Sequence, residues 1–87
     1  MWVSHWDKVL RRVLDGRSDH NIRFDDLCGL LLRLGFDERI SGDHHVFGKD
    51  GVREIIDLQP QSDGKAKAYQ VRQVRDILRK YGLTQAP

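Results

Sequence analysis

Two adjacent histidines, His44 and His45, are the side chains of this sequence best suited to proton transfer. The unperturbed pKa of histidine is about 6.5, so an imidazole can accept or release a proton near neutral pH. The pair directly follows the turn signal Ser41-Gly42-Asp43 and begins an apolar pattern that continues through Phe47. If the chain catalyses a reaction, we expect that reaction at this stretch.

The alternation of a β-strand assigns the two histidines to opposite faces. His45 shares its face with Phe47, which is the better core residue, whereas His44 shares its face with Val46. We therefore expect His45 to be a structural residue at the edge of the core and His44 to point outward.

Two carboxylates are candidates to orient the His44 imidazole. With a two-residue turn at Asp50-Gly51, a hairpin would bring Asp57 opposite His44. A three-residue turn would shift the register and remove that pairing. Asp43, which stands directly before the histidines, is the second candidate.

Apolar residues at helical spacing predict helices over residues 4–15, 24–34 and 68–81. Ser4 followed three residues later by Asp7 is typical of a helix start. A glycine stands at or just after the end of each helix, where a left-handed residue is common.

Strands are predicted over residues 36–40, 44–48 and 52–58, and Pro60 cannot continue a central strand. The element order predicts an α+β fold in which the helices cover one face of a three-stranded antiparallel sheet. The other face of the sheet stays open. The apolar positions predict a core that draws on Phe24, Leu27, Leu31, Leu34, Phe36, Ile40, Phe47, Ile56, Val74 and Leu78.

The chain of 87 residues has the length of one domain, and its single cysteine, Cys28, excludes an intrachain disulfide. Cys28 lies on the apolar stripe of the second helix, so we expect a buried thiol. Neither a zinc-type spacing nor a run of carboxylates is present, so we expect no metal and no cofactor. The longest apolar run, Leu30-Leu31-Leu32, cannot span a membrane, and no signal-peptide pattern opens the chain. We expect a cytoplasmic protein.

The net charge of +2 gives no general argument for a nucleic-acid partner, but the cations are unevenly distributed. Between Lys65 and Lys80, six lysines and arginines stand against one acid. A solvated helix face and a solvated hairpin tip are the simpler interpretations. The candidate contacts for RNA are Lys49, Arg53, Lys65, Lys67, Arg72, Arg75 and Arg79.

Five motifs follow one another: Leu34-Gly35-Phe36, Gly42-Asp43-His44-His45-Val46-Phe47, Asp50-Gly51, Ile55-Ile56-Asp57-Leu58 and Tyr81-Gly82-Leu83. In this order they resemble the HicA toxins. The resemblance implies a double-stranded-RNA-binding-domain-like fold over residues 23–84, with residues 1–22 as an additional helix and loop. It also implies a ribosome-independent mRNA interferase, neutralised by a HicB antitoxin, with His44 as the catalytic histidine.

The chain departs from the pattern of that family at three places. Asp43 stands where the family usually has serine. The segments Leu58-Gln59-Pro60 and Ala68-Tyr69-Gln70-Val71 replace the usual end of the third strand and start of the last helix. The helix at residues 4–15 is additional.

Two other functions are compatible with the sequence. A domain of the same fold could bind RNA or a protein without catalysis, through the basic helix and the open sheet face. Alternatively, Trp2 and Trp6 could make the first helix a surface for homodimer formation, because two exposed tryptophans on one short helix are unfavourable.

Overall fold

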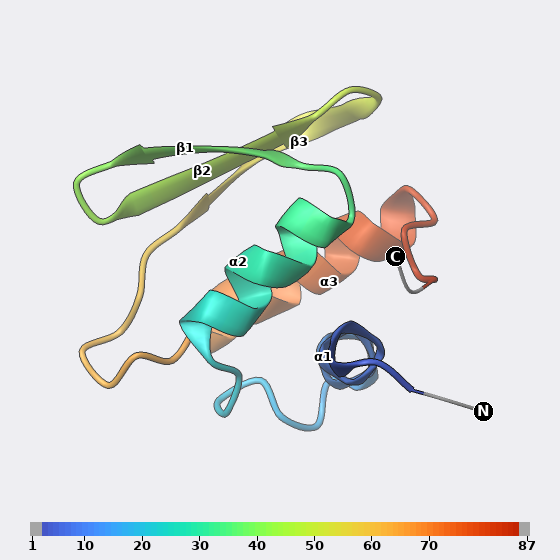
Figure 1. Cartoon of the computed structure of the whole chain (residues 1–87), viewed down its shortest axis with the longest axis horizontal. Coiled ribbons are helices and arrows are strands. Elements are labelled where there is room, and N and C mark those ends of the chain that lie inside the picture. Colours follow the sequence, from blue (N-terminus) through green and yellow to red (C-terminus); the bar gives the residue numbers. More distant parts are fainter. Residues whose placement is uncertain (1–2, 86–87) are drawn as a thin grey trace.

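The computed structural model of this protein describes residues 3–85 and arranges them in layers (Figure 1). In chain order the elements are α1 (His5–Asp15), α2 (Phe24–Arg33), β1 (Asp37–Ser41), β2 (His44–Lys49), β3 (Val52–Leu58) and α3 (Ala68–Lys80). The strands form one antiparallel sheet in the order β1-β2-β3. Figure 1 shows α2 and α3 on one side of this sheet, with α1 beyond them. The predicted α+β fold is confirmed.

The helix α1 begins and ends as its sequence predicts. Ser4 Oγ accepts the backbone N–H of Asp7 at 3.1 Å, and Asp7 Oδ2 accepts the backbone N–H of Ser4 at 2.8 Å. At the other end, Gly16 has a φ of 74°, the left-handed conformation that glycine adopts without strain. Both ends are therefore closed by local hydrogen bonds and turn geometry.

The apolar face of α1 packs against α2 of the same chain. The Trp6 ring lies on Gly29 of α2 so closely that a methyl group at Gly29 would overlap it. The Arg33 guanidinium lies 5.5 Å from the centroid of the same ring. Trp6 thus serves the contact between two helices of one chain, whereas the other tryptophan of the predicted partner surface, Trp2, lies outside the described residues.

The core lies between the sheet and the helices and extends to α1. The strands contribute Phe47, Ile56 and Leu58, which are fully buried. The helices contribute the fully buried residues Val13, Leu27, Leu30, Leu31, Val71, Val74 and Leu78. All of them belong to one hydrophobic cluster, so the first helix shares its core with the rest of the chain.

Two predicted core residues lie at or outside the edge of this cluster. Ile40 is 61% exposed, although its pairing with His45 places it on the helix side of the sheet. The turn between β1 and β2 extends past α2 (Figure 1), and Ile40 is one of the last two residues of β1 before this turn. Leu34 follows the last turn of α2 and is only half-buried against the core. Alternation predicted the face of Ile40 correctly but could not predict where the helix layer ends.

The hairpin of β2 and β3 combines a tight turn with a bulge. Lys49 pairs with Val52 across the two-residue turn. Farther from the turn Phe47 pairs with Ile56, so three residues of β3 lie opposite Gly48 alone. The bulge lengthens β3 relative to β2 by two residues.

This bulge moves Asp57 away from its predicted partner. Asp57 pairs with Val46 and not with His44, so the predicted register is wrong by two residues. Because side chains alternate with a period of two, the shift keeps His44 and Asp57 on one face. The predicted separation of His44 from His45 is confirmed.

Candidate active site on the open face of the sheet

His44 lies at the start of β2 on the face of the sheet that no helix covers, and its side chain is 48% exposed. Its Nδ1 lies 3.1 Å from each carboxylate oxygen of Asp57, through a diagonal contact between the strands. Asp43 is exposed in the adjacent turn, and within residues 3–85 its side chain makes no hydrogen bond. Of the two predicted orienting carboxylates, Asp57 is therefore the one in contact.

The side-chain amide of Gln59 contacts both ring nitrogens of His44. The Gln59 Nε2 lies 2.7 Å from His44 Nε2 and 3.0 Å from His44 Nδ1, and the Gln59 Oε1 accepts a hydrogen bond from Lys67 Nζ at 3.3 Å. A proton on Nδ1, donated to Asp57, leaves the lone pair of the ring on Nε2. Four side chains thus form one hydrogen-bonded chain in which His44 Nε2 is the basic atom.

A buried glutamine, Gln70, fixes the end of β3 that carries Asp57 and Gln59. Gln70 is 4% exposed. Its Oε1 accepts the backbone N–H of Gln59 at 3.2 Å, and its Nε2 donates to the carbonyl of Asp57 at 3.4 Å. Sequence reasoning assigned no role to Gln59 or Gln70. The available signal was the position of Gln70 on the apolar stripe of α3, four residues before Val74.

The loop between β3 and α3 is tied down, which gives Lys65 and Lys67 defined positions. Lys65 forms a backbone bridge with Arg23, the residue before α2. Asp63 Oδ1 accepts the backbone N–H of Lys65 at 2.9 Å, and this hydrogen bond lowers the pKa of the Asp63 carboxyl. The loop is therefore held in place, and Lys67 at its end contacts Gln59 of the His44 cluster.

A recess of about 430 Å³ lies on the same face of the sheet, beyond the His44 cluster. Its lining combines apolar and charged side chains: Val46, Val52 and Ile55 with Arg39, Lys49, Asp37 and Asp50, beside Gly48. Val46 is the neighbour of Asp57 across the strands. An extended ligand lying across the open face would therefore contact both the recess and His44.

Two of the predicted RNA contacts, Arg75 and Arg79, are bound to the end of α1. Arg75 pairs with both carboxylate oxygens of Asp19, at 2.8 and 3.1 Å, and donates to the Val13 carbonyl at 3.1 Å. Arg79 donates to the carbonyl of Leu14. The side chains of Arg75 and Asp19 are only 13% and 9% exposed, so a phosphate contact at Arg75 would require this pair to break.

The other predicted cations are closer to solvent. Arg53 and Arg72 are exposed, and Lys49, Lys65 and Lys67 are half-buried. Lys67 reaches the His44 cluster through Gln59, and Lys49 lines the recess. The Lys49 ammonium, however, lies against Gly35 at the end of α2, on the helix side of the sheet. Lys67 is therefore the predicted cation in contact with the His44 cluster on the open face.

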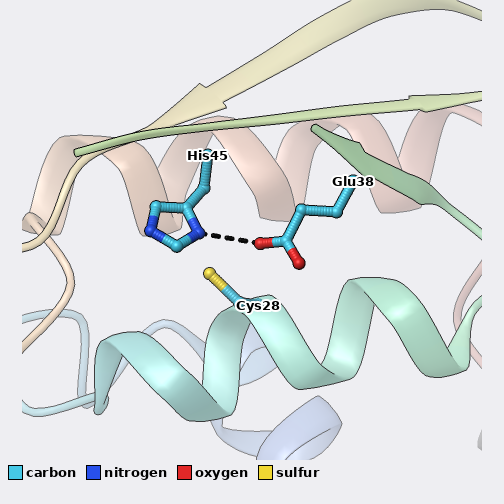
Figure 2. A group of neighbouring side chains, drawn as sticks. All are labelled: Cys28, Glu38 and His45. Atoms are coloured by element: carbon cyan, nitrogen blue, oxygen red, sulfur yellow. Dashed lines mark hydrogen bonds and ion pairs between the residues drawn. The ribbon is translucent and has the colours of Figure 1, made fainter. Parts of the chain in front are cut away.

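His45 lies on the inner face, at the edge of the core (Figure 2). Its Nδ1 is 2.8 Å from Glu38 Oε2, and its ring packs edge-on against Phe24. Cys28 of α2 faces this pair, and burial together with the negative charge of Glu38 raises the pKa of the thiol to about 12. The predicted burial of Cys28 is confirmed. Its meeting with Glu38 and His45 was not predicted, because the three residues lie on separate elements.

No protein-family model, no curated protein and no solved structure matches this chain. Along residues 3–85, no helix is long and apolar enough to cross a membrane.

Proposed function

We propose that this protein is an endoribonuclease that cleaves mRNA with His44 as its general base. The observation that supports this most directly is the hydrogen-bonded position of His44 on the open face, between Asp57 and Gln59. The resemblance of the motifs to the HicA toxins points to the same residue. In this proposal the protein is the toxin of a toxin–antitoxin pair, acts in the cytoplasm and is neutralised by a HicB-like protein.

The proposed reaction uses the ribose of the RNA as nucleophile. His44 Nε2 removes the proton of a 2′-hydroxyl, and the 2′-oxygen forms a bond to the adjacent phosphorus. The bond from phosphorus to the 5′-oxygen breaks, and that oxygen takes a proton from water. The hydroxide that remains accepts the proton held by His44, which restores the base. The products are a 2′,3′-cyclic phosphate and a 5′-hydroxyl. This reaction requires no cofactor.

Three neighbouring side chains have distinct tasks in this mechanism. Asp57 holds Nδ1 and stabilises the imidazolium that forms on His44. Lys67 is linked to His44 through the Gln59 side chain, and its ammonium neutralises the negative charge that develops on the phosphate. Gln59 covers Nε2 in the free protein, so its side chain rotates aside when the 2′-hydroxyl binds.

The cations around the open face supply the binding energy for the RNA backbone in this proposal. Arg53 would contact it at the hairpin, and Lys65 and Lys67 at the loop before α3, whereas the Lys49 ammonium lies on the helix side of the sheet against Gly35. Arg72 is an exposed contact on α3. Arg75 and Arg79 are left out of the interface because they hold the end of α1.

The test is cleavage of a defined mRNA by the purified protein, with product ends identified chemically. We expect 2′,3′-cyclic phosphate ends from the wild type and at least about a hundredfold less cleavage from His44→Gln. The matched control is His20→Gln, which removes an exposed histidine elsewhere on the surface and should cleave normally. Expression of the wild type should also arrest growth unless a HicB-like partner is present. Unchanged cleavage by His44→Gln would contradict the proposal.

One observation favours a second function, a domain that binds RNA or a protein without cutting. The Gln59 amide already lies 2.7 Å from His44 Nε2, the atom that would act as the base. Under this alternative the wild type binds RNA with a strong salt dependence but leaves it intact, and His44→Gln binds equally well. The cleavage assay separates the two functions directly.

A further inference from the structure

A second group of convergent side chains lies on the face of the sheet opposite His44. Figure 2 shows Cys28 from α2, Glu38 from β1 and His45 from β2 pointing toward one another. The Cys28 sulfur, a carboxylate oxygen of Glu38 and a ring nitrogen of His45 all lie within 4.8 Å of one another. Three separate elements thus bring one sulfur, one oxygen and one nitrogen ligand to a single point.

The group is sheltered and still reachable from solvent. Cys28 is 8% exposed, while the side chains of Glu38 and His45 are 18% and 23% exposed. The Phe24 ring packs against His45, with 4.9 Å between the ring centroids, and closes one side of the group. Reduced solvent strengthens the attraction between a cation and these ligands, and the exposed part of the pair provides an entry path.

We propose that Cys28, Glu38 and His45 form a binding site for a divalent transition-metal ion, and that the ligand set favours Zn²⁺. Sulfur, imidazole and carboxylate are the three side-chain ligands of zinc, whereas Mg²⁺ and Ca²⁺ prefer oxygen alone. Three protein ligands leave the fourth position of a tetrahedral ion for water or an external ligand.

Metal binding at this point requires small side-chain movements. With zinc–ligand bonds of about 2.0–2.3 Å, tetrahedral geometry holds the ligand atoms roughly 3.4–3.6 Å apart. His45 Nδ1 and Glu38 Oε2 are now 2.8 Å apart, so the ion would separate them and replace their shared proton. His45 then carries its proton on Nε2, and Cys28 releases its thiol proton to solvent as the metal–sulfur bond forms.

The charges around Cys28 favour a cation. Burial, Glu38 and Asp25 all oppose ionisation of the thiol and raise its pKa to about 12. A bound dication reverses this balance, because a thiolate and nearby carboxylates are then attracted to the positive charge. The same negative charges that keep the metal-free thiol protonated would therefore stabilise the metal-bound thiolate.

A metal here would join β1 and β2 to α2 beneath the strand that carries His44. Its expected effect is on stability, because an ion that binds the folded protein shifts the folding equilibrium in proportion to its concentration over Kd. At a hundredfold excess over Kd the shift is about a hundredfold. This inference is independent of RNA cleavage, and its test uses no RNA.

The test is titration of the reduced full-length protein with Co²⁺, followed by competition with Zn²⁺. Co²⁺ bound through Cys28 produces a sulfur-to-metal charge-transfer band in the near ultraviolet and visible bands of tetrahedral cobalt. We expect one ion per chain, displacement by Zn²⁺, and a rise in the melting temperature with Zn²⁺. Cys28→Ala should lose the charge-transfer band, and His45→Gln should weaken binding at least tenfold.

The matched control is His44→Gln, which changes the neighbouring histidine on the other face and should retain the full cobalt spectrum. Circular dichroism of each variant without metal establishes that it is folded before titration. A wild type without a charge-transfer band would overturn the proposal. So would equal cobalt affinity of the folded Cys28→Ala variant and the wild type, or loss of binding in His44→Gln.

Discussion

His44 and His45 are neighbours in the chain, and each places Nδ1 against a carboxylate from another strand, yet their surroundings differ. The His44 and Asp57 side chains are 48% and 52% exposed, whereas those of His45 and Glu38 are 23% and 18% exposed. The distances, 3.1 and 2.8 Å, are similar. The same two groups, an imidazole and a carboxylate, therefore lie on an accessible surface at His44. One residue further along the strand, at His45, they lie at the edge of the core.

The difference in burial predicts a difference in what each pair contributes. Exposed ion pairs contribute about 0–1 kcal/mol to stability, because water competes for both groups. A buried group that loses its hydrogen-bond partner costs about 1–3 kcal/mol. We therefore expect His44 to matter for activity and His45 for stability.

The largest expected effect is the loss of RNA cleavage when His44 is replaced by glutamine. A general base contributes about 10²–10⁴-fold to a rate, so cleavage by His44→Gln should fall by at least about a hundredfold. The free energy of unfolding should stay within about 0.5 kcal/mol of the wild type, because the side chain is half exposed. Parallel cleavage assays and urea denaturation measure both quantities. If His44→Gln loses stability as well as activity, the expectation that His44 matters only for activity is wrong.

The converse substitution, His45→Ala, should lower stability and spare the chemistry. It leaves Glu38 without its partner at the edge of the core and removes the ring that packs on Phe24. The free energy of unfolding should fall by about 1–3 kcal/mol. Cleavage per folded molecule should equal that of the wild type, measured well below the unfolding midpoint. A hundredfold loss of activity in the folded variant would show that both histidines take part in catalysis.

Asp57 and Glu38, the carboxylates that contact the two histidines, allow the same comparison of activity and stability with smaller expected effects. Asp57→Asn should reduce cleavage roughly tenfold, well below the ~10⁴ of a buried orienting aspartate, because Asp57 is half exposed. Glu38→Gln should leave cleavage unchanged and lower the denaturation midpoint. Rates for both variants at a single saturating RNA concentration are sufficient. Equal rates for Asp57→Asn and the wild type would remove Asp57 from the mechanism.

Much of this comparison can be predicted from the sequence, because it depends on local periodicity. Apolar spacing determined the helices and strands, and strand alternation determined the faces of His44, His45 and Asp57. The bulge at Gly48 could not be predicted, because no local pattern distinguishes a two-residue turn with a bulge from one without. The bulge changed the predicted pairing but not the predicted faces, since a shift of two residues preserves the face of each side chain.

The rest of the site depends on how separate elements dock. Gln70 contacts the end of β3 only because α3 packs beneath it, and its residue type alone gives no partner. The pair of Arg75 with Asp19 joins residues 56 positions apart. Helical spacing alone gave Arg75 the appearance of a surface cation, whereas α1 covers it. The meeting of Cys28 with His45 has the same origin.

A smaller effect is expected at Lys67, which extends the exposed cluster and is one of the proposed RNA contacts. Lys67→Gln should weaken RNA binding about two- to fivefold and reduce the slope of log K against log salt by about 0.7, the value for one phosphate contact on a single strand. Lys8→Gln, an exposed lysine on α1, is the matched control and should change neither quantity. Fluorescence anisotropy at several salt concentrations measures both. Equal slopes for Lys67→Gln and Lys8→Gln would place the RNA elsewhere.

The smallest effect concerns Glu54, which pairs with Lys80 and contacts neither histidine. This pair measures how much an ion pair at the surface contributes to the stability of this protein. Its carboxylate accepts hydrogen bonds from Lys80 Nζ, at 2.8 Å, and from the Tyr81 hydroxyl. These bonds lower the pKa of Glu54 from 4.5 to about 2. Because the folded pKa is the lower one, the stabilisation is complete above about pH 4.5 and disappears as the pH falls toward 2. Glu54→Gln should therefore be slightly less stable than the wild type at pH 7 and equally stable near pH 2, with the difference reduced by salt. Urea denaturation across this pH range measures it, and a difference that grows on acidification would show that the hydrogen bonds of Glu54 are not the source.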